Sequence, residues 1–183
     1  LVEAEQVQPR AFQGTARVMA MVPALRADVA WPAMWTRWLT AVERAVRERQ
    51  DQLDVVHAAL EALHATLRVQ EQHAWWHDTW PTVVRLCDVH ASMTLSDLCF
   101  LVDMLHMLFV HRPCTDTNVD AMLHALHECI AHGLHVADAL SLSHLHRLVK
   151  RVQESFEFMT HKGATRAKVL DALQVCALSL IHI

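Results

Sequence analysis

Apolar side chains recur at alternating four- and three-residue steps through much of the N-terminal half of the chain. The series consists of Trp35, Leu39, Val42, Val46, Leu53, Val56, Leu60, Leu63 and Leu67. Neither Gly nor Pro occurs between residues 33 and 80. This spacing places one apolar stripe along a helix and is typical of a coiled-coil-like seam. We therefore predict one long helix over about 32–70, and the polar residues 47–52 leave open two helices broken near residue 50.

The near-absence of turn-forming residues predicts an all-α fold. The 183 residues include three Gly and five Pro, whereas β-rich folds need many tight turns built on these residues. Isolated Gly14, Gly133 and Gly163 cannot form a glycine-rich phosphate loop, which excludes the P-loop and Rossmann classes. Apolar residues make up 53% of the chain, enough to bury a core.

Further helices are bounded by Pro, by Gly and by capping residues. Pro81 suits a first helical turn, residues Thr94–Asp97 form a capping box, and Gly133 suits a left-handed cap at a helix end. The expected helices cover about 10–22, 81–91, 94–111, 117–133, 141–161 and 165–180.

The C-terminal half contains an internal repeat at an offset of 47 residues. Leu95, Ser96 and Leu98 recur as Leu142, Ser143 and Leu145, and the apolar pattern of the next helix recurs likewise, so that Leu123 matches Leu170. A period near 47 with two helices per unit predicts stacked helical hairpins in a solenoid-like array. We expect an N-terminal helical region with a tryptophan-rich corner over 1–90 and two hairpin repeats over 91–183 (about 94–136 and 141–183), all in one continuous domain.

The repeat unit Leu-Ser-x-Leu-x-x-Leu-Val, followed by Leu-x-Ala-Leu-x-x-Cys, resembles the octotricopeptide and heptatricopeptide repeats that accompany RAP domains in organellar RNA-binding proteins. The closest local matches are Thr94–Leu101 and Met122–Leu126. The resemblance covers about residues 90–180, but the unit is longer than in those families and no RAP domain follows. It implies an organellar protein with a role in RNA maturation, in translation or in the mitochondrial ribosome.

Positive charge is concentrated near the C-terminus. The formal net charge is −4, which excludes a strongly basic nucleic-acid binder, but residues 147–168 carry six cations against two Glu. Such a patch can contact RNA phosphates without reading sequence, and a solvated helix face is the alternative. The candidate phosphate contacts are Arg147, Lys150, Arg151, Lys162, Arg166 and Lys168.

Six tryptophans fall into two groups. Trp31, Trp35 and Trp38 share one helical face, and the others cluster at the corner after the long helix. Exposed tryptophan anchors protein interfaces and stacks on single-stranded RNA, whereas buried tryptophan packs the core. The interface candidates are Trp31, Trp35, Trp38, Trp75, Trp76 and Trp80.

The sequence nominates no catalytic or metal site. His127 and His132 are spaced by five residues rather than the four that a zinc-binding helix requires, and the pair His73 and His77 lacks two further ligands. No Ser or Cys stands in a recognisable nucleophile setting. We therefore expect no enzyme activity, no cofactor, no metal and no small-molecule substrate.

The five cysteines are odd in number and form no Cys-x-x-Cys pair, so we expect reduced, mostly buried thiols in a protein that is not secreted. No apolar run reaches the ~18 residues of a membrane span.

Together with the resemblance, these features predict a non-catalytic structural subunit of a large organellar ribonucleoprotein. The expected setting is a mitochondrial ribosome or RNA-processing assembly in the matrix, with other protein subunits and RNA as partners. The alternatives are an accessory subunit of a respiratory or other energy-converting complex and, for location, the cytoplasm.

Overall fold

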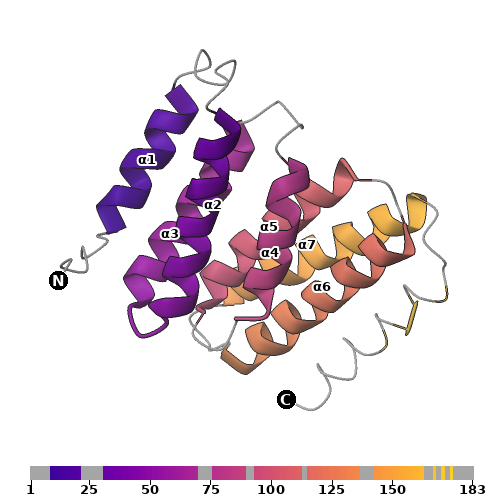
Figure 1. Cartoon of the computed structure of the whole chain (residues 1–183). Coiled ribbons are helices and arrows are strands. Elements are labelled where there is room, and N and C mark those ends of the chain that lie inside the picture. Colours follow the sequence, from indigo (N-terminus) through magenta and orange to yellow (C-terminus); the bar gives the residue numbers. More distant parts are fainter. Residues whose placement is uncertain are drawn as a thin grey trace.

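The computed structural model describes residues 9–21, 31–69, 76–89, 93–112, 115–136 and 142–162, with isolated residues at 167, 170, 171 and 174. Within these ranges the chain is all helical, which confirms the predicted fold class (Figure 1). The described helices are α1 (Pro9–Met21), α2 (Trp31–Glu48), α3 (Leu53–Val69), α4 (Trp76–Cys87), α5 (Leu95–Val110), α6 (Asp116–Val136) and α7 (Leu142–His161). The helix expected over 165–180 lies almost entirely outside the described residues.

The predicted single helix over 32–70 is wrong, because the chain bends between α2 and α3. The alternative of two helices broken near residue 50 is confirmed. The amide of Arg49 still bonds to the Ala45 carbonyl, but Gln52 donates back to the Arg49 carbonyl at 2.8 Å and closes a turn. The regular apolar spacing survives because α2 and α3 pack against each other and turn their stripes into one core. Leu53, which starts α3 at the bend, is 48% exposed, whereas Leu60 is fully buried.

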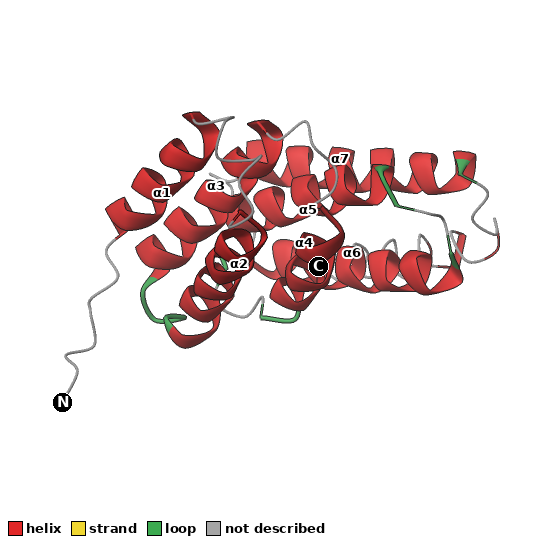
Figure 2. Cartoon of the chain, turned by 45° about the horizontal axis from the view of Figure 1, so that its top comes forward, coloured by secondary structure: helices red, strands yellow, loops and turns green. Residues whose placement is uncertain are grey.

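Successive helices alternate between two layers. Helices α1, α3, α5 and α7 contact one another in that order and form one layer, while α2, α4 and α6 form the other (Figure 2). Contacts between the layers join α2 to α3, α4 to α5, α5 to α6 and α6 to α7. One hydrophobic core extends through both layers, from Phe12 in α1 to Met159 in α7.

Neighbouring helices within a layer run in the same direction. Along α5 and α7 the paired residues advance together, from Cys99 with His144 to His106 with Ser155. The sequence offsets of these pairs, 45 and 49, lie close to the 47-residue period. Leu98 is buried and Leu145 packs partly buried against the same core. Leu170, the predicted core match of Leu123, is instead 53% exposed, so equivalence of the two hairpins as repeats remains a prediction.

Helix α5 is the central helix of its layer, with α3 on one side and α7 on the other. Its capping box is present as predicted: Thr94 Oγ1 accepts from the Asp97 amide, and the Asp97 carboxylate accepts from the Thr94 amide. Asp97 is fully buried and also contacts His57 Nδ1 of α3 at 2.7 Å. This acid therefore fixes both the start of α5 and its position against α3.

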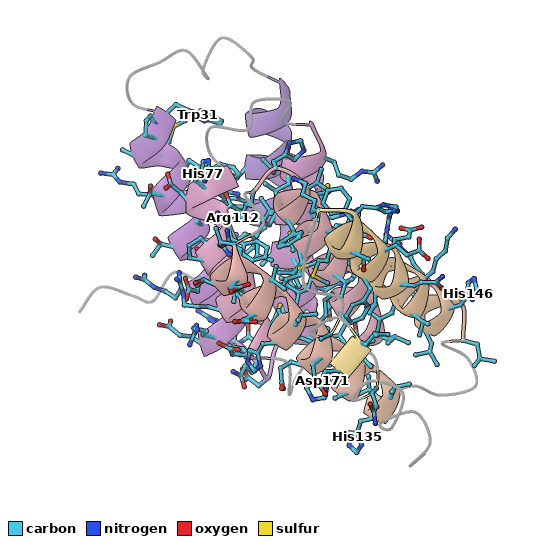
Figure 3. The ribbon with its side chains drawn as sticks, turned by 90° about the vertical axis from the view of Figure 1, so that its right-hand side faces the viewer. Trp31, His77, Arg112, His135, His146 and Asp171 are labelled. Atoms are coloured by element: carbon cyan, nitrogen blue, oxygen red, sulfur yellow. The ribbon has the colours of Figure 1, made fainter. Side chains whose placement is uncertain are left out.

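Pro81 lies inside α4 rather than in its first turn, so the expected helix start at 81 is wrong. Proline has no N–H, so it cannot donate to the carbonyl of His77 four residues earlier. The Arg112 guanidinium, which lies beside His77 in Figure 3, donates to that carbonyl at 3.5 Å. The same guanidinium covers the Trp80 ring. A partner distant in sequence thus allows α4 to begin five residues before the proline.

Gly133 is an interior residue of α6, which continues to Val136, so its expected role as a helix cap is also wrong. A Cβ at this position would lie 2.6 Å from Leu148 Cδ2 and 3.2 Å from Leu95 Cδ1. Glycine is present here because α5 and α7 approach α6 closely. The expected boundaries of the helices near 10–22, 94–111 and 141–161 agree with the structure to within about two residues.

Candidate functional site

A cluster of charged side chains crosses three parallel helices on the layer formed by α1, α3, α5 and α7. Its centre is Asp103 of α5, whose side chain is 6% exposed. Arg147 Nη2 donates to Asp103 Oδ2 at 2.5 Å, and Arg151 Nε donates to Oδ1 at 2.6 Å. Arg147 and Arg151 lie one helical turn apart on α7, so both reach the same carboxylate from one face. Asp103 thereby holds two guanidinium groups side by side.

The carboxylate of Asp103 remains ionised because of these contacts. Burial by itself raises its pKa, but the contacts with His64 and Arg147 and the charges of both arginines outweigh burial, so the pKa lies well below its ordinary value. Arg151 also donates to Glu154 at 2.6 Å. The Arg151 pKa is raised because these two carboxylates outweigh its own desolvation.

A pocket of about 130 Å³ opens beside this cluster. Helix α3 contributes His64 and Arg68, which are spaced by four residues and face α5. His64 Nε2 lies 3.6 Å from Asp103 Oδ2, and Arg68 makes no ion pair with any residue of the described ranges. The lining residues are His64, Arg68, Asp103, His106, Met107, Arg147 and Arg151. Three arginines from two helices therefore border the pocket that one buried acid also lines.

His106 borders the pocket as a neutral imidazole. Its pKa is lowered by burial and then by the charge of Arg151. Its Nδ1 lies 3.0 Å from Ser155 Oγ, whose hydroxyl donates to the Arg151 carbonyl at 2.9 Å. Since a hydroxyl has one proton, Ser155 accepts from Nδ1–H, and we assign the lone pair of neutral His106 to Nε2.

The Ser155–His106 pair does not form a nucleophile with its base. Ser155 is 1% exposed in the interior of α7, and its proton is directed to a backbone carbonyl. Attack on a substrate requires an accessible hydroxyl whose proton passes to the histidine. The pair instead fixes the position of α5 against α7.

Four of the six predicted phosphate contacts lie within the described residues, and the structure separates Lys162 from the other three. Arg147 and Arg151 are joined to Asp103, and Lys150 is exposed on α7 between them. Lys162 lies about 16 Å beyond Arg151 along α7, at about 1.5 Å per residue, and donates to the Val110 carbonyl at 2.7 Å. It neutralises the C-terminal end of α5. Arg166 and Lys168 lie outside the described residues.

The described cations of the basic segment 147–168 therefore do not form one site. Arg147 and Arg151 line the pocket. The pocket also contains side chains that the sequence analysis did not nominate: Arg68, His64, Asp103 and His106. Pairs at helical spacing were visible in each segment, but nothing in the sequence indicates that α3, α5 and α7 lie side by side.

Four of the six tryptophans belong to the core of the chain. Trp31 and Trp35 have no exposed surface, Trp38 is 7% exposed and Trp80 is 5% exposed. Trp35 Nε1 donates to Thr79 Oγ1 at 3.0 Å and links α2 to α4. These side chains pack the protein itself and present no surface to a partner. The side chains of Trp75 and Trp76 lie outside the described part.

Three cysteines are described, Cys87, Cys99 and Cys129, and all are buried free thiols, as expected. Burial raises the pKa of Cys99 to about 11, and the neighbouring Cys129 thiol and burial raise that of Cys87. The thiols of Cys87 and Cys99 are therefore protonated near neutral pH. Within the described ranges, no group of three or more His, Cys, Asp or Glu could hold a metal ion, and no described helix is long and apolar enough to cross a membrane.

The fold and the pocket define an all-helical protein of two alternating layers with an arginine-rich pocket on one layer. No protein-family model, no curated protein and no solved structure matches the chain.

Proposed function

We propose that the protein is a non-catalytic structural subunit of a large organellar ribonucleoprotein, such as a mitochondrial ribosome or an RNA-processing assembly. In this role the helical layers contact neighbouring protein subunits, and the arginine-rich face contacts RNA. The resemblance of residues 90–180 to organellar RNA-binding repeats supports the setting.

One observation carries the proposal: Arg68, Arg147 and Arg151 border one pocket although some 80 residues separate the first from the other two. Guanidinium groups present planar sets of donors that match phosphate oxygens. Asp103 neutralises one of the three charges and holds two of the side chains, so less side-chain freedom is lost when a phosphate binds. The three arginines and Asp103 give the pocket lining a formal charge of +2.

The net negative charge of the chain is compatible with this role. Phosphate contacts depend on local positive charge and are screened by salt over a Debye length of about 8 Å at physiological ionic strength. Acidic residues farther away weaken nonspecific attraction to nucleic acid. Such a protein binds RNA through local contacts within an assembly and does not bind nucleic acid nonspecifically along its length.

The test is sedimentation of the tagged full-length chain from a lysate of its native cells, with and without ribonuclease. We expect the chain in a heavy fraction that shifts to lighter fractions after ribonuclease treatment. Sedimentation as a light species without treatment contradicts the proposal. A heavy, nuclease-resistant position with respiratory subunits also contradicts it and favours the accessory-subunit alternative.

Ultraviolet crosslinking adds a residue-level readout. We expect Arg68→Gln to reduce the yield of crosslinked RNA more than Arg37→Gln, which removes the same charge from an exposed position on the opposite layer. Equal yields for the two variants contradict RNA contact at the arginine-rich face.

A further inference from the structure

In the pocket between α3, α5 and α7, Asp103 holds Arg147 and Arg151, and some N–H groups of these arginines remain available to a ligand. A guanidinium carries five N–H groups, and Asp103 and Glu154 engage only some of those on Arg147 and Arg151. Both oxygens of Asp103 are occupied by arginine. Because the carboxylate is already engaged, the remaining donors determine what the pocket attracts.

The size of the pocket suits a compact group. Its volume of about 130 Å³ exceeds the cavity of about 10–15 Å³ that a single water needs. The lining is polar and cationic apart from Met107. A compact oxyanion meets both the size and the charge of this space.

We propose that this pocket is a binding site for a single phosphate group, held by Arg68 from one side and by Arg147 and Arg151 from the other. The inference rests on the proposed function, which supplies the group as a backbone phosphate of RNA. One anchored phosphate fixes the position of the RNA strand on the protein and carries no base specificity.

His106 couples this site to protons. The charged groups around it are Asp103 on its own helix, Arg147, Arg151 and Glu154 on α7, and Arg68 on α3. His64 on α3 is a further titratable group of the pocket lining. Burial and the charge of Arg151 keep the His106 pKa below its ordinary value. A bound anion offsets the arginine charges and favours the imidazolium, whose Nε2–H becomes an additional donor. Binding is therefore expected to strengthen as the pH falls through the range in which His106 titrates.

The probe is sulfate, which has the shape of phosphate and keeps a double negative charge across this pH range. Binding to the purified full-length chain is measured by calorimetry at constant ionic strength. We expect saturable binding that Arg68→Gln weakens about tenfold, because a hydrogen bond to a charged group is lost. Arg37→Gln is the matched control, since Arg37 is an exposed cation of α2 that does not line the pocket; we expect a change below about twofold.

Neither variant disturbs the Asp103 contacts, so a loss of folding does not explain their difference. Absence of saturable sulfate binding, or equal weakening by both substitutions, overturns the phosphate site. Retention of the wild-type pH dependence by His106→Gln overturns the proton coupling.

Competition with RNA separates this inference from the proposed function. We expect a short single-stranded RNA to displace sulfate. RNA that binds without displacing sulfate overturns the pocket as the RNA contact and leaves the ribonucleoprotein role intact. Saturable sulfate binding together with nuclease-resistant sedimentation overturns the ribonucleoprotein role and, with it, RNA as the source of the phosphate, although the pocket then binds anions.

Discussion

Leu53 and Leu60 provide a direct test of the bend between α2 and α3. They are seven residues apart, so in one continuous helix they would occupy equivalent positions on the apolar seam. In the structure, Leu60 is fully buried and Leu53 is 48% exposed at the first residue of α3. Truncating each to alanine should therefore have very different effects.

The expected magnitudes follow from this burial. Replacing a fully buried Leu by Ala costs about 2–5 kcal/mol, because apolar contact is lost and a cavity remains; we expect about 3 kcal/mol for Leu60→Ala. Leu53→Ala creates no enclosed cavity and should remain within about 0.5 kcal/mol. With about 2–4 °C per kcal/mol for a chain of this length, Leu60→Ala should lower the melting temperature by about 6–12 °C.

The stability of both variants is measured by thermal and urea unfolding. The loss of helix is followed by far-ultraviolet circular dichroism at about 222 nm. Large and equal losses of stability would show that residues 53 and 60 share one buried face, as in a continuous helix. A small effect of Leu60→Ala would refute its place in the core.

Three further predictions concern α5, α6 and their neighbours. Gly133→Ala should lower the unfolding free energy, measured by urea titration, by up to about 2 kcal/mol. Overpacking against Leu148 costs about 1–3 kcal/mol, and this cost exceeds the gain in helix propensity of about 1 kcal/mol. A stabilised variant would contradict the close approach of Leu148 to Gly133. Asp103→Asn should lower the unfolding free energy by about 2–3 kcal/mol at neutral pH. This loss is smaller than for breaking a fully buried ion pair, because Arg147 and Arg151 are half-exposed. Since the folded-state pKa of Asp103 is lowered, its contribution is present above about pH 4 and is lost as the pH falls below that value, so acid titration should destabilise the variant less than the wild type. The His106 pKa is also lowered, so the stability that this group contributes is present above about pH 6.5 and is lost at lower pH. His106→Gln should therefore reduce the slope of the unfolding free energy against pH between about pH 7 and 5. An unchanged slope would refute the lowered pKa of His106.

The local sequence determined that the chain is helical and where several helices begin and end. Scarce Gly and Pro, apolar spacing of three and four residues, and the capping box at Thr94 and Asp97 act within one or two turns, so neighbouring residues suffice to predict them. The 47-residue repeat remains a prediction, because Leu95 is buried whereas its counterpart Leu142 is 62% exposed. The phosphate-contact role of the arginines remains a prediction.

Tertiary structure decided every feature that depends on a distant partner. The apolar stripe suits a straight coiled coil and a hairpin equally well, since both bury one face, and only packing of α2 on α3 favours the bend. Pro81 is tolerated inside α4 because Arg112 binds the freed carbonyl of His77. Gly133 belongs within α6 because Leu148 occupies the space beside it.

The pocket has the same origin. Each of its arginines occupies an ordinary helical position, and its charge arises only where α3 and α7 flank Asp103 of α5. Sequence spacing specifies which side chains share a helix face, because that geometry repeats every 3.6 residues. Which faces meet depends on the summed packing of the whole core, and that sum is established only when the chain folds.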